Sequence, residues 1–309
     1  IIFGKTNVPL NLADWQSFND IYGTTNNPWD LGRTPGGSSG GSAAALAAGL
    51  TGLEAGSDIG ASIRNPAHYC GVFGHKPTFG IVPDDGHTPP GVISHSDIAV
   101  VGPMARSAED LALSLDIMAG PDRYTGTGWR LELPPARKTA LKDFKVAVML
   151  SSGEAEVDQP YQDCLANVAD RMAQLGATVS DTARPDVDTA RAFEVYITIL
   201  RAATSGSATD EQRVNFAKVA ADPETDPNSY LARMAKGVLL PHREWLALDN
   251  EREFMRRAWA EFFKEWDILL CPAATSAAWP HDQAGERHNR FITVNGKPQR
   301  GVDQMFWAG

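Results

Sequence analysis

Two serine-containing loops carry the residue types that nucleophilic catalysis needs. The first, residues 36–42, reads GGSSGGS, and the second, residues 58–64, reads DIGASIR. A serine hydroxyl attacks a carbonyl only when a neighbouring group takes its proton, and backbone N–H groups stabilise the resulting oxyanion. A lone glycine-serine run is also typical of a flexible turn or a phosphate cradle. The second loop, with its flanking carboxylate and guanidinium, favours a mount for a nucleophile.

Helices and strands must hold these loops in place. An alanine-rich run directly follows the first loop and is a strong helix former. Hydrophobic periodicity predicts the other elements. Strands are expected near residue 53 and at 144–150, 177–179 and 267–271; helices are expected from residue 43 and at 108–119, 158–175, 190–203 and 242–265. This alternation predicts an α/β layer structure with a largely buried sheet. The segment 121–140 is rich in proline, glycine and charge and is expected to be a surface excursion.

Composition excludes several classes of protein. The chain has 309 residues and a formal net charge of −10, which argues against a surface for nucleic acid or anionic membrane. No apolar run approaches the roughly 18 residues of a membrane span. The three cysteines, Cys70, Cys164 and Cys271, are far apart in the sequence. This spacing argues against a disulfide framework and fits a reducing compartment, so we expect a cytoplasmic protein.

Six short segments together resemble the amidase signature family, which includes fatty acid amide hydrolase, malonamidase and the A-type component of amidotransferases. They are GKTN at 4–7, GGSSGGS at 36–42, DIGASIRNP at 58–66, GVFGHKPT at 71–78, VGPMARS at 101–107 and DILLCP at 267–272. The resemblance implies the amidase signature fold, with α/β/α layers around a twisted mixed β-sheet. It also implies one domain over 1–309, with the signature core at 1–120 and a variable, substrate-side region that completes the sheet at 121–309.

The family's catalytic triad consists of a lysine, a serine beside a cis peptide bond and a nucleophilic serine. By resemblance, Ser62 is the nucleophile and Ser38 is the cis serine. A hydroxyl donates and accepts hydrogen bonds at once, so Ser38 can pass the proton of Ser62 to the lysine. We therefore expect a cis bond at Gly37–Ser38 or Ser38–Ser39.

Residues around the two serines are expected to shape the site. The resemblance implies an oxyanion hole formed by the backbone N–H groups of Ile59, Gly60, Ala61 and Ser62. The family often has glycine at the position of Ala61. Supporting roles fall to Ser39, Asp58 and Arg64. The last two are expected either to contact substrate or to form an ion pair that holds the loop.

The lysine of the triad has no counterpart in this sequence. The family places it some tens of residues before the glycine-serine run, so we expect it on a segment upstream of residue 1. Lys5 belongs to the GKTN segment, where the family does not place its base. We accordingly expect the chain to be an internal piece, cut at both ends, with little activity by itself.

Three other interpretations remain open at this point. The run GGSSG at 36–40 fits the G-x-S-x-G pattern of α/β-hydrolases, with Ser38 as nucleophile and His281 or His288 as base, although such an elbow needs a buried strand directly before the serine. A GKT tripeptide at 4–6 could end a phosphate-binding loop, although Pro9 disfavours the helix that should follow. The third interpretation is an A-type component of a larger amidotransferase complex.

The predicted reaction is acyl transfer. Ser62 attacks an amide carbonyl, ammonia or an amine leaves, and water cleaves the acyl-enzyme. No cofactor is implied, and no histidine spacing indicates a metal site. The expected substrate is a small or medium apolar amide or ester, and a homodimer is one assembly compatible with this class. Trp129, Tyr196 and Trp279 are candidates for an apolar pocket or for the core.

Overall fold

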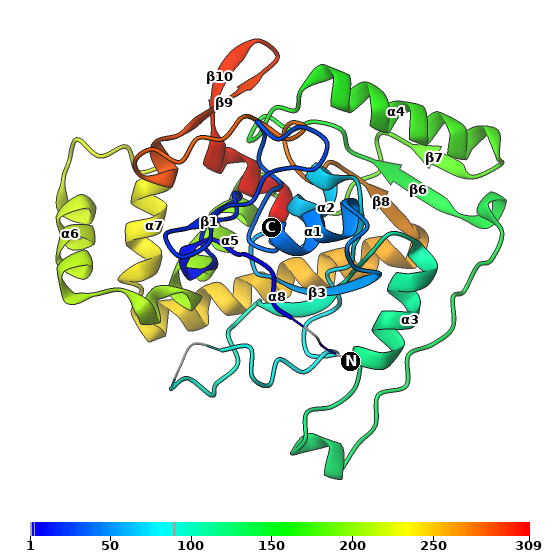
Figure 1. Cartoon of the computed structure of the whole chain (residues 1–309), viewed down its shortest axis with the longest axis horizontal. Coiled ribbons are helices and arrows are strands. Elements are labelled where there is room, and N and C mark those ends of the chain that lie inside the picture. The colour runs from blue at the N-terminus through cyan, green and yellow to red at the C-terminus, as the bar shows by residue number, and fades with distance from the viewer. Residues whose placement is uncertain (1, 3, 89–90) are drawn as a thin grey trace. The chain divides into compact units, whose positions relative to one another are not determined.

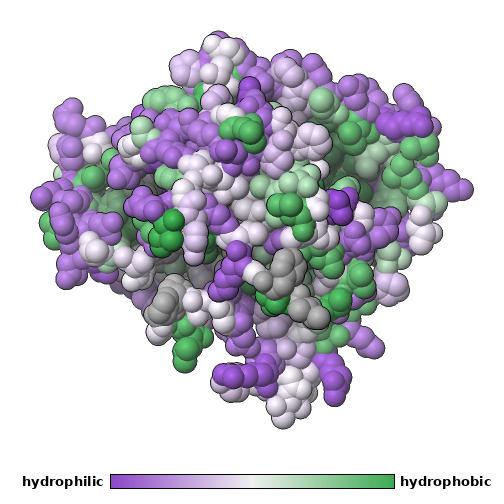
Figure 2. Space-filling view, viewed as in Figure 1, coloured by the Kyte–Doolittle hydropathy of each residue, from purple (hydrophilic) through white to green (hydrophobic). Residues whose placement is uncertain are grey.

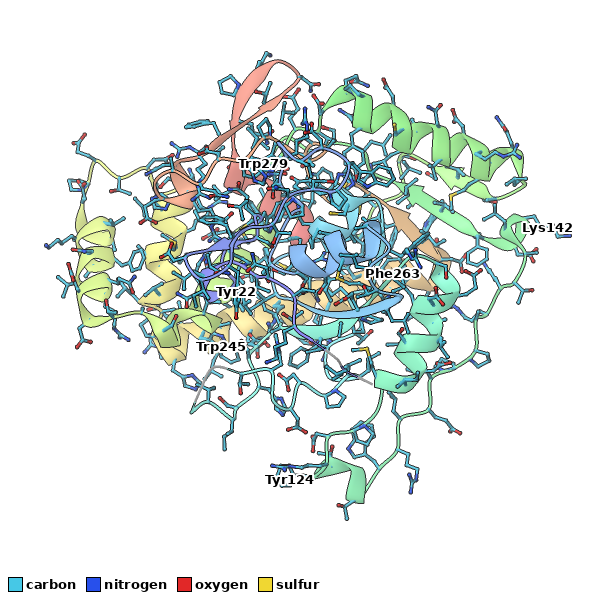
Figure 3. The ribbon with its side chains drawn as sticks, viewed as in Figure 1. Tyr22, Tyr124, Lys142, Trp245, Phe263 and Trp279 are labelled. Carbon is cyan, nitrogen blue, oxygen red and sulfur yellow. The ribbon has the colours of Figure 1, made fainter. Side chains whose placement is uncertain are left out.

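A computed structural model describes residues 2, 4–88 and 91–309 and divides the chain into two compact units (Figure 1). Unit 1 comprises residues 1–134 and 276–287, and unit 2 comprises residues 135–275 and 288–309. The first boundary falls inside the segment 121–140. That segment is largely exposed, as predicted, and it also connects the two units. Figure 3 shows the side chain of Tyr124 on this segment, and Tyr124 is 71% exposed.

Unit 1 is built on a small antiparallel sheet with helices packed beside it. Its elements are β1 (Phe18–Asn19), β2 (Gly23–Thr24), α1 (Gly40–Ala47), β3 (Leu53–Asp58), α2 (Arg64–Cys70), β4 (Phe73–Gly74), β5 (Val100–Ala105) and α3 (Ala108–Met118). Strand β5 lies between β3 and β4. The buried core consists of Ala43, Leu46, Ile63, Ala67, Cys70 and Met104. This core holds α1 and α2 together, so the loops that precede these two helices meet.

Unit 2 contains a parallel sheet. Its elements are β6 (Lys145–Val148), α4 (Gln159–Gln174), β7 (Thr178–Ser180), α5 (Thr189–Ala203), α6 (Asp210–Ala221), α7 (Tyr230–Val238), α8 (His242–Glu265), β8 (Ile268–Leu270), β9 (Phe291–Val294), β10 (Lys297–Arg300) and the 3₁₀ helix Gly301–Ala308. Strand β6 pairs in parallel with both β7 and β8. Its buried residues Val146 and Val148 pack with Ala169 of α4 and with Ala177.

The predicted α/β class is confirmed, and each helix and strand expected from periodicity is present within a few residues of its predicted bounds. The described strands fall into separate small sheets instead of a single continuous one: β3, β4 and β5 are antiparallel, whereas β6, β7 and β8 are parallel. Ser107 begins α3, because its hydroxyl accepts the N–H of Asp110 at 3.0 Å.

Helix α6 and the hairpin β9–β10 are among the elements not expected from the sequence. Helix α6 has no buried residue, so it has no apolar stripe to reveal it. Its start is marked instead by a capping box between Thr209 and Gln212. The hairpin turns at Asn295–Gly296, where both residues have positive φ (51° and 74°). An Asn-Gly pair of this kind is a strong hairpin signal, and it was available in the sequence.

The surface mixes polar and apolar side chains. Figure 2 shows hydrophobic residues interspersed with hydrophilic ones on the viewed face. In unit 1, Ile21, Tyr22 and Trp29 are each at least 75% exposed. Among the helices of the described residues, none is both long and apolar enough to cross a bilayer.

Candidate active site

The two serine loops are in direct contact. The backbone N–H of Ser39 donates to the carbonyl oxygen of Ser62 at 3.0 Å. The peptide bond Gly37–Ser38 is cis, which confirms the predicted position of that bond. Ser38 and Ser62 are both buried, with exposed fractions of 2% and 6%. The structure therefore brings both predicted serines into one buried site.

Asp58 anchors the second loop. It is the last residue of β3, and its buried carboxylate accepts the backbone N–H of Ala61 at 2.9 Å, of Ile63 at 3.1 Å and of Arg64 at 3.3 Å. The Arg64 guanidinium adds two further donors, Nε at 3.0 Å and Nη2 at 2.9 Å. Of the two predicted roles for this pair, the geometry favours the ion pair that fixes the loop over direct substrate contact.

The charges around Asp58 shift two pKa values. Burial by itself would raise the pKa of Asp58, but Arg64, Lys76 and the Ile63 N–H outweigh it, so the pKa is lowered. The carboxylate is therefore the form present at neutral pH. Burial also lowers the pKa of Lys76; Asp58 opposes this shift and Arg64 adds to it. Lys76 is thus a partly desolvated ammonium group close to the loop.

Ala61 has a backbone conformation that favours glycine. Its φ is +66°, in the left-handed region, which costs an alanine on the order of 1 kcal/mol. This explains physically why a glycine suits the position. The Ala61 N–H already donates to Asp58 at 2.9 Å, so it serves the loop's own shape. The oxyanion donors that we carry forward are the other three N–H groups predicted, those of Ile59, Gly60 and Ser62.

The first loop is held by close backbone contacts. A Cβ on Gly37 would lie 2.2 Å from the carbonyl oxygen of Asp14, so only glycine fits there. The N–H of Gly37 donates to Oδ1 of Asn65 at 3.2 Å, and the N–H of Asn65 donates to the carbonyl of Ala61 at 2.7 Å. Asn65 therefore links the two loops, a role that the sequence alone did not indicate.

The remaining serines of the first loop act as supports. The hydroxyl of Ser39 accepts the N–H of Ser57 at 3.4 Å, and it thereby ties the loop to β3. The hydroxyls of Ser42 and Thr6 lie 2.9 Å apart. This contact secures the start of α1 against the GKTN segment.

The two motif-based alternatives do not fit this geometry. An α/β-hydrolase elbow needs a strand directly before the nucleophile, whereas the nearest preceding strand, β2, ends at Thr24. No α-helix follows the GKT tripeptide among the described residues; only the 3₁₀ turn Leu10–Leu12 does. Both interpretations are therefore wrong.

The predicted pocket aromatics are not gathered at these loops. Trp279 is 9% exposed and donates its indole N–H to the Tyr69 hydroxyl at 2.9 Å, so it behaves as a core residue (Figure 3). Trp129 is 44% exposed and belongs to the segment that connects the units. Tyr196 lies in α5 of unit 2. Among the described residues, no group of histidine, cysteine or acidic side chains is arranged to hold a metal ion.

Known proteins share this fold. The chain superposes on fatty acid amide hydrolase with a TM-score of 0.69 and 27% identity, covering 90% of this chain and 48% of that one. It superposes on the A-type component of glutamyl-tRNA(Gln) amidotransferase from Thermotoga maritima with a TM-score of 0.74 and 23% identity, covering 100% of this chain and 63% of that one. Fold and loops thus define an α/β protein of the amidase signature type.

Sequence comparison gives the same family. The family model Amidase matches residues 1–297. The A-type component of glutamyl-tRNA(Gln) amidotransferase from Acaryochloris marina (strain MBIC 11017) is 30% identical over 307 residues, which are 93% of this chain and 62% of that protein. This chain belongs to the amidase family, and it spans about three-fifths of the length of the relatives it matches.

Proposed function

We propose that this chain carries the nucleophile and the proton relay of a serine-dependent amide hydrolase. Ser62 attacks the amide carbonyl while Ser38 takes its proton and passes one on to the triad lysine. The oxyanion is stabilised by the N–H groups of Ile59, Gly60 and Ser62. Return of the proton to the departing nitrogen releases ammonia or an amine, and water then hydrolyses the acyl-enzyme.

The observation that carries the proposal is the contact between the loops. The bond from the Ser39 N–H to the Ser62 carbonyl, 3.0 Å long, places the residues that adjoin Ser38 directly against Ser62. Burial of both serines supports the same proposal, because an oxyanion is stabilised more strongly by fixed N–H dipoles where water is excluded.

The lysine that takes the proton from Ser38 is placed by resemblance upstream of residue 1. A lysine acts as a base only in its neutral form, which burial favours by lowering its pKa. Lys76 is the substitute within the chain, since burial lowers its pKa. If a longer chain turns over no faster than residues 1–309 alone, Lys76 and then Lys5 are the first residues to mutate.

The substrate, assembly and location remain part of the proposal. We retain a small or medium apolar amide or ester as substrate, no cofactor, a homodimer as a compatible assembly, and a reducing, cytoplasmic environment. Nucleic acid is not an expected ligand, given the net charge of −10.

A screen of fatty, aryl, indolyl and peptide amides against the full chain tests this function. Ser62→Ala should abolish hydrolysis of each amide that the wild-type protein cleaves. Ser114→Ala is the matched control, because Ser114 is also buried, at 7% exposure, but lies in α3. Full activity in Ser62→Ala would refute the proposal.

A second candidate function is supported by the relatives. Several of them are A-type components of glutamyl-tRNA(Gln) amidotransferases, which points to transfer of ammonia from an amide within a complex. The same acyl-enzyme chemistry would serve both functions. Copurification of a partner, with glutamine cleavage that depends on it, would favour this candidate; partner-independent cleavage of apolar amides would favour the hydrolase.

A further inference from the structure

A short segment before β1 contacts both serine loops. Trp15 is buried, at 8% exposure, and its indole Nε1 donates to the carbonyl oxygen of Gly60 at 2.8 Å. Two residues later, Ser17 is 1% exposed, and its hydroxyl donates to the carbonyl of Gly36 at 3.1 Å and accepts the N–H of Gly40 at 3.2 Å. One segment of the chain therefore reaches the oxyanion loop and the Ser38 turn.

Trp15 acts on a peptide group whose other end is also fixed. The carbonyl of Gly60 and the N–H of Ala61 belong to the same planar peptide. Trp15 holds the oxygen at 2.8 Å and Asp58 holds the N–H at 2.9 Å. With both ends held, the plane cannot rotate. The neighbouring N–H groups of Gly60 and Ser62, which we propose as oxyanion donors, keep their directions as a consequence.

Ser17 spans the turn that carries the cis serine. Its hydroxyl contacts the carbonyl before that turn and the N–H after it, at Gly36 and Gly40. The segment itself is anchored through Gln16, which is 1% exposed and whose Oε1 accepts the N–H of Asp282 at 3.0 Å. The close approach of Asp14 to Gly37 leaves no room for the segment to shift toward the turn.

We propose that Trp15 and Ser17 are positioning residues that keep the oxyanion loop and the Ser38 turn in register. This inference rests on the proposed function, because register matters only if Ser62 and the N–H groups near it react together. Trp15 touches no reacting atom; it acts through the Gly60–Ala61 peptide.

The test compares two tryptophan-to-phenylalanine variants of the full chain. Trp15→Phe keeps an aromatic ring and removes the single N–H donor. Trp307→Phe is the matched control, since Trp307 is also 8% exposed and donates its Nε1 to a backbone carbonyl, that of Ala155 at 3.2 Å, in unit 2. The probe is an alkyl fluorophosphonate, whose phosphoryl oxygen needs the same N–H donors as an oxyanion. It requires no knowledge of the natural substrate.

The readout is the inactivation rate at saturating probe, together with the half-saturating concentration. We expect Trp15→Phe to lower the saturating rate by about fivefold to tenfold, the effect of one lost hydrogen bond, with the half-saturating concentration unchanged within about twofold. Trp307→Phe should label at the wild-type rate even if its melting temperature falls as much. A purely structural role would move the melting temperature and leave the rate of the folded fraction intact.

The outcomes separate this inference from the proposed function. If Ser62 is labelled but Trp15→Phe reacts as fast as Trp307→Phe, the positioning role is wrong and the function stands. If Ser62→Ala is labelled as well as wild type, the proposed function fails first. Should Trp15→Phe not fold, Ser17→Ala decides: it should slow labelling of Ser62 by about fivefold, and an unchanged rate would overturn the inference.

Discussion

Replacing Asp58 by asparagine should destabilise the protein strongly at neutral pH. The carboxylate is 0% exposed and faces five N–H donors from Ala61, Ile63 and Arg64. Asparagine has the same shape, but it removes the charge and turns an NH₂ group toward some of those donors. Breaking a buried ion pair by removing one partner costs about 3–5 kcal/mol. Because the Arg64 side chain is 27% exposed and water can solvate part of its charge, the lower end of that range, about 3 kcal/mol, is expected.

The same substitution predicts a definite pH dependence. The pKa of Asp58 is lower in the folded protein than its ordinary value of about 3.9. Stability from a lowered carboxyl pKa is fully present above the unfolded-state pKa and is lost as pH falls through the folded-state pKa. The difference in stability between wild type and Asp58→Asn should therefore be constant above about pH 5 and should shrink below about pH 4.

Thermal or urea unfolding, followed from pH 3 to pH 8, measures this difference. At pH 7 the unfolding temperature should fall by roughly 6–12 °C. Asp30→Asn is the matched control, because the Asp30–Arg33 pair is 56% and 46% exposed and its loss should leave the midpoint within error. If Asp58→Asn were as stable as wild type at pH 7, or the gap did not narrow in acid, the anchoring role of Asp58 would be refuted.

Three further outcomes follow from local geometry. Gly41→Ala should lower the unfolding midpoint sharply, because its Cβ would lie 2.4 Å from the carbonyl oxygen of Asn7, whereas Gly52→Ala, with nothing within 4 Å, should not; equal midpoints would contradict this packing. The pKa of His95 is raised by its hydrogen bond to Asp84, so NMR titration should give a value above about 6.5 that falls in Asp84→Asn; an unchanged pKa would dismiss the contact. Burial raises the pKa of the Cys70 thiol to about 12, so iodoacetamide at pH 8 should leave this cysteine unmodified in the native protein, and rapid alkylation would show that it is accessible.

Much of the fold could be predicted because local signals agree with it. The buried strand β6 is a continuous apolar run, and α4 carries an apolar stripe, so periodicity placed both correctly. The capping residue Ser107 likewise marks the start of α3. Helix α6 escaped prediction because it buries nothing, and hydrophobic periodicity detects only elements with a buried face.

The site could be predicted only as far as its motifs reach. The position of the cis bond next to Ser38 followed from the family pattern and is confirmed. The contacts of Trp15, Ser17 and Asn65 could not be predicted, because each joins segments far apart in the sequence through a single side chain. The role of the Ala61 N–H also depends on a local geometry that the letters DIGASIR do not state.

The most direct test of the central claim is to find which serine becomes covalently modified. The full chain is treated with an alkyl fluorophosphonate, digested, and mapped by mass spectrometry. A nucleophile at Ser62, relayed by Ser38, predicts a single adduct on the peptide that contains Ser62, and loss of that adduct in Ser62→Ala. An adduct on Ser38 with Ser62 unmodified, or the same labelling in Ser62→Ala, would contradict it.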